Sequence, residues 1–272
     1  MTANSGYPLL KQMPVVLRAR GFRLYTQDGR RLIDLWLNGG AAILGHTPPN
    51  VLREIKNTGG RGLYAPFPHF TEGRYLKALS KLFPGRSFRL YAAPPPELSV
   101  LFNTGEAKLW RPFSNPESPF AVTENAPVII PILPGVQFWR GGLPLGLCVL
   151  AAESARCFDS GGQFAQFPES ENLSPVLLAA AARGLYDIMA APDRANPQFP
   201  RIEKALEKSP WQRTGIYLHL KEKPEAGDWS SLFHKFMEAG FLLPPSPSFP
   251  LILPGELSPG EEAKLVMALG EV

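Results

Sequence analysis

Alternation of apolar and polar positions is clearest near the N-terminus. The segment "GFRLYTQDGRRLIDLWL", residues 21–37, contains two β-rich runs joined through Asp28 and Gly29. An Asp-Gly pair accepts the positive φ that a tight hairpin turn requires. The pattern therefore predicts a β-hairpin, and its alternation places these side chains on buried faces: Phe22, Leu24, Leu32 and Trp36.

Helical spacing replaces this alternation after Thr47. Thr47 is a candidate N-cap with Pro48 at the first helical position of "PPNVLREIKNTGG". A second helix is predicted to start at Thr71 and to stop at Gly85. Its apolar face contains Tyr75, Leu76, Leu79, Leu82 and Phe83.

Proline interrupts the pattern between Tyr91 and Gln166. The pieces include "YAAPPPELSV", "RPFSNPESPF" and "PVIIPILPG", with one candidate strand in "GLPLGLCVLAA". Regular order returns at Ser174 and Pro175, which precede "VLLAAAARGLYDIMAA". That segment is apolar on nearly every side, so it predicts a buried helix.

The C-terminal part predicts a compact α+β unit. "RTGIYLHLK" indicates a strand, and "DWSSLFHKFMEAG" indicates a helix with Asp228 as N-cap and Gly240 just past its end. "FLLPPSPSFPLIL" supplies one or two extended segments, and Ser258 with Glu261 forms a capping box for the last helix. The side chains expected to face inward from the Asp228 helix are Trp229, Leu232, Phe233, Phe236 and Met237.

The stretch "VLFNTGEAKLW", residues 100–110, indicates a short strand, an Asn103-Thr104-Gly105 turn and the start of a helix. Such a layout often presents backbone N–H groups to a phosphate, so a small anionic ligand is one interpretation. A turn of this composition also commonly connects two elements without binding a ligand. Both interpretations stay open, and Lys108 is the lysine that lies close to the turn in sequence.

Charge and composition exclude several classes of function. The 28 basic and 24 acidic residues give a net charge of +4 without a dense basic cluster, which argues against nucleic acid and anionic membranes as partners. The sequence shows neither a signal-peptide core nor 18 consecutive apolar residues, so we expect a soluble, cytoplasmic protein. Cys148 and Cys157 lack metal-ligand spacing and are expected to be structural.

The run "VLRARGFRLYTQDGRRLIDLWLNGGAAILGHTPPNVLREI" resembles the N-terminal segment of class III aminotransferases. These are fold type I pyridoxal-phosphate enzymes and include glutamate-1-semialdehyde aminomutase. The resemblance covers about the first 85 residues. It resumes at residues 100–110, where the family carries an Asn-Ser-Gly-Ser/Thr-Glu-Ala turn whose backbone N–H groups bind the cofactor phosphate.

The resemblance implies an α/β protein with a reduced fold type I architecture. Residues 1–60 are expected to pack with a C-terminal α+β domain at residues 196–272, beside a reduced central domain at residues 61–195. Class III relatives are homodimers, so the aromatic run from Tyr64 to Phe70 is a candidate interface, although core packing explains it as well.

At the turn, the resemblance assigns the phosphate to Asn103, Thr104, Gly105 and Glu106, with the hydroxyl residue between Gly and Glu missing. Between Leu109 and Arg201, where the family carries its Schiff-base lysine, this chain contains no lysine. Lys108 is a weak substitute that we expect to point to solvent. The role of the Asp that pairs with the pyridine nitrogen is not transferred to Asp159.

Two hypotheses remain. The first is a catalytically degenerate aminotransferase relative with a binding or assembly role and no cofactor. The second is an active enzyme, either using pyridoxal phosphate through a non-standard lysine or running a different chemistry. The missing lysine favours the first. We expect the four histidines to be packed or surface residues, with His46 structural at a helix start: His46, His69, His219 and His234.

Overall fold

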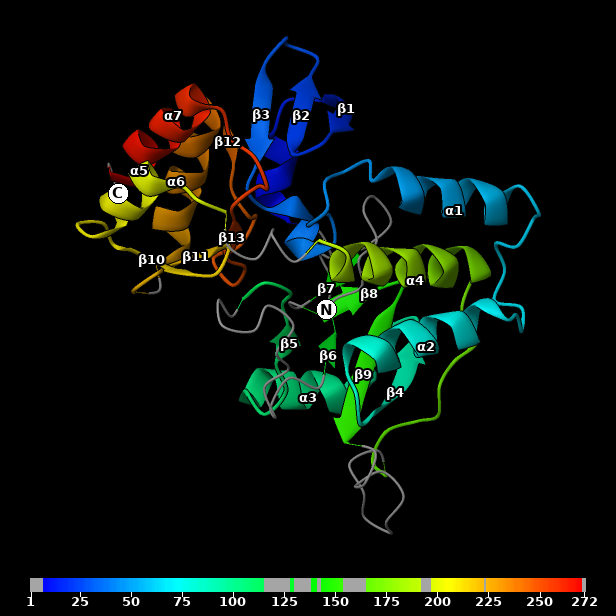
Figure 1. Ribbon diagram of the computed structural model, residues 1–272. Coiled ribbons are helices and arrows are strands. Elements are labelled where there is room, and N and C mark those ends of the chain that lie inside the picture. Colours follow the sequence, from blue (N-terminus) through cyan, green and yellow to red (C-terminus); the bar gives the residue numbers. More distant parts are fainter. Residues whose placement is uncertain are drawn as a thin grey trace. The chain divides into compact units, whose positions relative to one another are not determined.

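A computed structural model describes residues 7–114, 128–129, 138–140, 143–153, 165–191, 197–222 and 224–270. The chain forms two compact units: unit 1 contains Met1–His46, Phe113–Pro119 and Asp193–Val272, and unit 2 contains Thr47–Pro112 and Phe120–Pro192. Both units mix helices with strands, as the α/β expectation requires (Figure 1). Within the described ranges, no helix combines the length and apolar composition that a bilayer crossing needs.

Unit 1 contains two sheets. The first has the order β1-β2-β3-β12, with β1, β2 and β3 antiparallel and β12 added parallel to β3. The second is the antiparallel sheet β10-β11-β13. The elements of unit 1 are η1 (Pro8–Gln12), β1 (Val16–Arg20), β2 (Arg23–Thr26), β3 (Arg31–Asp34), η2 (Leu37–Gly40), α5 (Pro200–Leu206), β10 (Trp211–Thr214), β11 (Tyr217–Leu220), α6 (Ala226–Glu238), β12 (Phe241–Leu242), β13 (Leu251–Ile252) and α7 (Pro259–Gly270).

The predicted N-terminal hairpin is confirmed as β2 and β3. Gly29 in its turn has φ +80, a conformation that side chains with a Cβ rarely adopt. Phe22, Leu24 and Leu32 are buried as expected, and Trp36 is partly buried. The parallel pairing of β3 with β12 also confirms that N- and C-terminal segments build one α+β unit.

Two expectations for the C-terminal part need correction. The predicted single strand "RTGIYLHLK" is a hairpin, because Gly215 turns the chain between β10 and β11 with φ +60. A Cβ at Gly215 would lie 1.9 Å from the Phe113 carbonyl oxygen, so only glycine fits this turn. Helix α6 begins at Ala226, which places Asp228 in its first turn and not at the N-cap.

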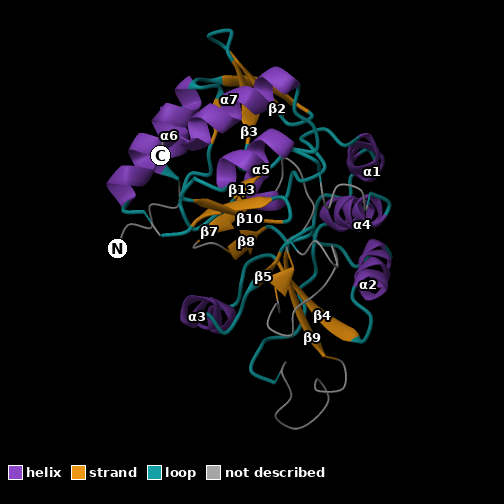
Figure 2. Cartoon of the chain, turned by 60° about the vertical axis from the view of Figure 1, so that its left-hand side comes forward, coloured by secondary structure: helices purple, strands orange, loops and turns teal. Residues whose placement is uncertain are grey.

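Unit 2 packs three of its four described helices, α1, α2 and α4, beside a four-stranded sheet. Helix α4 lies between α1 and α2, as two different views show (Figures 1 and 2). Its side chains from Ala179 to Ala182 are almost completely buried, and their small size lets neighbouring helices approach closely. The elements of unit 2 are α1 (Pro49–Gly59), α2 (Thr71–Leu82), β4 (Arg86–Tyr91), α3 (Pro96–Thr104), β5 (Leu109–Trp110), β6 (Val128–Ile129), β7 (Phe138–Arg140), β8 (Leu143–Leu145), β9 (Cys148–Glu153) and α4 (Pro175–Met189).

Helices α2 and α4 begin at Thr71 and Pro175, the positions predicted. Helix α1 begins at Pro49, one residue later than expected, and packs on α4. Helix α1 belongs to unit 2, and the N-terminal segment of unit 1 ends at His46. The sheet of unit 2 has the order β4-β9-β6-β5, and β7 and β8 form a separate hairpin.

Candidate functional site

Residues 96–110 form a helix, a turn and a strand, which is the reverse of the predicted strand, turn and helix. Helix α3 starts with Pro96 at its first position and Glu97 in its first turn, and it ends where Gly105 adopts φ +82. Strand β5 follows at Leu109. The strand expectation for residues 100–102 is therefore wrong.

The turn after α3 therefore lies at the C-terminal end of a helix and not at the N-terminal end that was expected. The N–H groups of Gly105 and Ala107 donate to the carbonyl oxygens of Phe102 (3.2 Å) and Leu101 (2.9 Å). The Thr104 hydroxyl also donates to the Leu101 carbonyl oxygen, at 3.1 Å. The C-terminal end of a helix carries partial negative charge, which repels an anion.

Glu106 adds a carboxylate whose Oε1 lies 3.1 Å from Thr104 Oγ1. Phosphate binding by Asn103, Thr104, Gly105 and Glu106 stays a prediction, but the helix N-terminus that motivated it is not present at this turn.

Among the described residues near the turn, neither Lys108 nor Cys148 is placed as an activated nucleophile. Lys108 is exposed and precedes β5, so it points to solvent as expected, although no helix begins there. Cys148 on β9 is buried, and burial raises the pKa of its thiol to about 12. Such a thiol stays protonated and unreactive at neutral pH, which agrees with a structural role. Cys157 and Asp159 lie outside the described residues.

Two consecutive residues with an unusual backbone conformation follow β3. Leu37 and Asn38 both have positive φ, +46 and +50, a conformation that costs about 1–3 kcal/mol for each such residue. Asp34, only 2% exposed, holds this turn. Its Oδ1 accepts the N–H groups of Trp36 (2.8 Å) and Leu37 (2.9 Å), and its Oδ2 lies 2.9 Å from His46 Nε2. Asp34 was not among the residues singled out from the sequence.

The histidines do not come together into a site. His46 contacts Asp34, which agrees with the structural role expected for it. His69 Nδ1 lies 3.1 Å from Thr71 Oγ1 at the start of α2, and His234 Nδ1 lies 2.7 Å from the Ser230 carbonyl oxygen within α6. His219 lies on β11 and lines a cavity.

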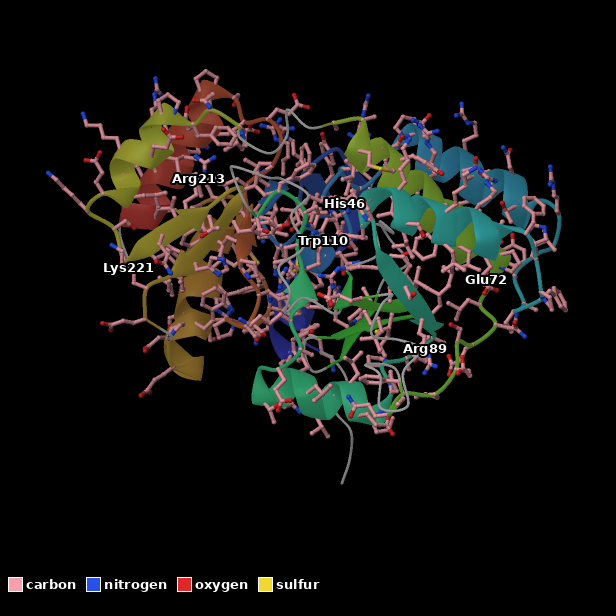
Figure 3. The ribbon with its side chains drawn as sticks, turned by 60° about the horizontal axis from the view of Figure 1, so that its bottom comes forward. His46, Glu72, Arg89, Trp110, Arg213 and Lys221 are labelled. Atoms are coloured by element: carbon pink, nitrogen blue, oxygen red, sulfur yellow. The ribbon has the colours of Figure 1, made fainter. Side chains whose placement is uncertain are left out.

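This cavity of unit 1 has a volume of about 230 Å³. Its buried floor is apolar and largely aromatic, and its rim carries His219, Lys221 and Glu222. Figure 3 shows Lys221 on the loop that follows β11. The floor residues come from β10, β11, α6, β13 and the segment before β13, so no local sequence pattern marks them as a group: Trp211, Leu218, Trp229, Phe249 and Leu251.

Comparison with known sequences gives full-length and partial relatives. The chain is 27% identical to an uncharacterized protein of Treponema pallidum over 90% of this chain and 91% of that protein. It is 25% identical to an uncharacterized protein of Borreliella burgdorferi over 93% and 89%. Glutamate-1-semialdehyde 2,1-aminomutase of Thermoplasma acidophilum is 36% identical over 75 residues, which are 27% of this chain and 18% of the enzyme. No family model matches the chain.

Comparison with solved structures shows which fold the chain has. An omega-transaminase from Sphaerobacter thermophilus superposes with a TM-score of 0.59 over 95% of this chain and 90% of that chain, at 14% identity. A transaminase with PLP bound gives a TM-score of 0.63 over 95% and 90%, also at 14% identity. The chain has the class III aminotransferase fold. At this identity the likeness shows the fold alone.

The described residues of this aminotransferase-like chain do not fit the cofactor where the resemblance places its phosphate. A phosphate needs free N–H donors or cations, whereas the turn after α3 presents helix-terminal carbonyl groups and the Glu106 carboxylate. The segment from Leu109 to Arg201 also supplies no lysine for the cofactor aldehyde.

Proposed function

We propose that this class III aminotransferase-like protein is catalytically degenerate and has a binding or assembly role. The observation that carries the proposal is the absence of lysine between Leu109 and Arg201. Transamination on pyridoxal phosphate depends on a lysine that holds the cofactor aldehyde as an imine and moves a proton. No other type of side chain performs both tasks.

The turn after α3 supports the same proposal independently. A degenerate enzyme is expected to lose the phosphate anchor together with the lysine, because both serve only the cofactor. The reversed order of helix and strand around Gly105 removes the donor-rich helix start on which that anchor depends. The adjacent Glu106 carboxylate makes the position still less favourable for phosphate.

The visible absorption spectrum with and without added pyridoxal phosphate tests the proposal. We expect the spectrum of the mixture to equal the sum of its components, no lysine adduct after borohydride treatment, and no amino transfer from common donors. A transaminase of this fold with PLP bound serves as positive control. A borohydride-sensitive band whose adduct maps to Lys108, and which Lys108→Ala removes, contradicts the proposal. An adduct on any other lysine contradicts it equally.

We also propose that the protein assembles as a homodimer through an aromatic patch on the segment that connects α1 to α2. The patch is defined as Tyr64, Phe67 and Phe70. These side chains are 66%, 55% and 62% exposed, which is unusual for three large apolar residues within seven positions. Aromatic residues are enriched at protein interfaces and bury large apolar areas there.

A further inference from the structure

We propose that the cavity of unit 1 binds a free amino acid with an apolar side chain. The proposal does not depend on the loss of catalysis, because the cavity is built entirely from residues 211–251. It concerns a site other than the turn after α3, and it identifies a ligand class from the chemistry of the lining.

The floor of the cavity determines what the body of the ligand must be. Trp211, Trp229 and Phe249 are 1–3% exposed, and they line the cavity together with aliphatic side chains. The Trp229 indole is fixed in position because its Nε1 donates to the Pro244 carbonyl oxygen at 3.1 Å. A rigid apolar floor of this kind selects an apolar group and excludes a strongly hydrated one.

The rim determines which charges the ligand carries. Among the described lining residues, Lys221 and Glu222 carry opposite charges, so a cation and an anion lie at the cavity entrance. Lys221 Nζ donates to the Ser209 carbonyl oxygen at 2.7 Å, which anchors the ammonium group and leaves two of its N–H donors for other acceptors. Glu222 is exposed and makes no hydrogen bond or ion pair to another described residue.

A zwitterion satisfies Lys221 and Glu222 at once. Its carboxylate accepts from Lys221, and its ammonium donates to Glu222, with each contact a charge-assisted hydrogen bond. A ligand with a single charge leaves one rim group without a partner. The volume of about 230 Å³ is below the roughly 300–1,000 Å³ of pockets for drug-sized molecules, so a ligand of amino-acid size is appropriate.

Titration calorimetry of the full chain tests this proposal with L-phenylalanine and L-leucine. Phenethylamine and 3-phenylpropionate serve as analogues that keep the ring and carry one charge each. We expect the amino acids to bind at least about tenfold more tightly than either analogue. Glu222→Gln and Lys221→Met should each weaken amino-acid binding by a similar factor. Thermal unfolding of both variants establishes that they are folded.

Glu207 and Lys208 provide a matched control. They form an equally exposed, consecutive acid–base pair in unit 1 that does not line the cavity. Glu207→Gln and Lys208→Met should leave binding unchanged. The proposal is overturned if no amino acid binds at millimolar concentration, if a single-charge analogue binds as tightly, or if the control pair weakens binding as much as the rim pair. Glu222→Gln alone decides the matter if Lys221→Met fails to fold, since Glu222 has no described partner to lose.

Discussion

Two buried tyrosines of unit 2 place their hydroxyl groups in different surroundings. Tyr75 on α2 is fully buried, and its Oη has no hydrogen-bond partner among the described residues. Burial raises the pKa of this phenol, which therefore stays protonated. Tyr91 on β4 is 1% exposed and donates to the Pro168 carbonyl oxygen at 2.7 Å. Only the Tyr91 hydroxyl makes a hydrogen bond that offsets the free energy lost when the group leaves water.

We expect Tyr75→Phe to raise the free energy of unfolding by up to about 1 kcal/mol, because it removes an unpaired buried donor and keeps the ring. Tyr91→Phe should lower it by about 1 kcal/mol through the lost hydrogen bond. Urea unfolding of the two variants beside the unaltered protein measures both changes. If the two substitutions destabilise equally, Tyr75 has an acceptor and the assignment is wrong.

At the scale of elements, Glu261 ties helix α7 to the β2–β3 hairpin. Its carboxylate accepts from Arg23 Nη2 at 2.7 Å and from Arg31 Nη2 at 3.2 Å. It also accepts the Ser258 N–H at 2.8 Å, while the Ser258 hydroxyl accepts the Glu261 N–H, so the predicted capping box is confirmed. The Arg23 hydrogen bond, with help from Ser258, lowers the pKa of Glu261 to about 2.

Glu261→Gln should lower the free energy of unfolding at pH 7, and the difference should shrink in acid. Because the folded-state pKa of Glu261 lies below its ordinary value of 4.5, its contribution is complete above that value and is lost as the pH falls toward 2. Chemical unfolding at several pH values between 3 and 7 measures this. Glu256→Gln changes the same charge at an exposed position, and its effect should be small at every pH. A Glu261→Gln effect that is constant with pH contradicts the assignment.

Local patterns predicted the elements that carry their own start and stop signals. The hairpin around Gly29, helices α2 and α4, and the Ser258–Glu261 box are all of this kind. The sequence does not predict helix α3, because "NTGEA" indicates a phosphate turn, in which a strand precedes the turn and a helix follows it. Leu98, Leu101 and Phe102 have helical spacing and pack toward one core cluster, which is the signal that identifies the helix.

The cavity could not be predicted, because strand pairing and helix packing bring Trp211, Trp229 and Phe249 together from three separate elements or loops. The spacing of these three residues in the sequence does not indicate that they lie close together. The Asp34 contacts were missed for a related reason. A buried aspartate at the end of a strand is visible in sequence only as a charged residue, and its partners Leu37 and His46 are fixed by the unusual backbone between them.

At the scale of the whole molecule, the aromatic patch predicts the oligomeric state. We expect a dimer by light scattering at micromolar concentration, and a monomer after the double substitution Phe67→Ser and Phe70→Ser, because the patch supplies the apolar area that association buries. Val100→Ser removes an equally exposed apolar residue elsewhere in unit 2, and it should leave the dimer intact. A monomeric parent protein, or a double variant that stays dimeric, contradicts the proposed interface.

The parallel pairing of β3 with β12 has a consequence for synthesis of the chain. Ile33 pairs with Phe241 and Asp34 with Leu242, so about 200 residues must leave the ribosome before β3 acquires this neighbour. At roughly 5–20 residues per second, translation takes about 10–40 s to reach that point. During this interval the nascent hairpin presents an unpaired, apolar strand edge, which is the kind of surface that chaperones shield and that otherwise invites aggregation.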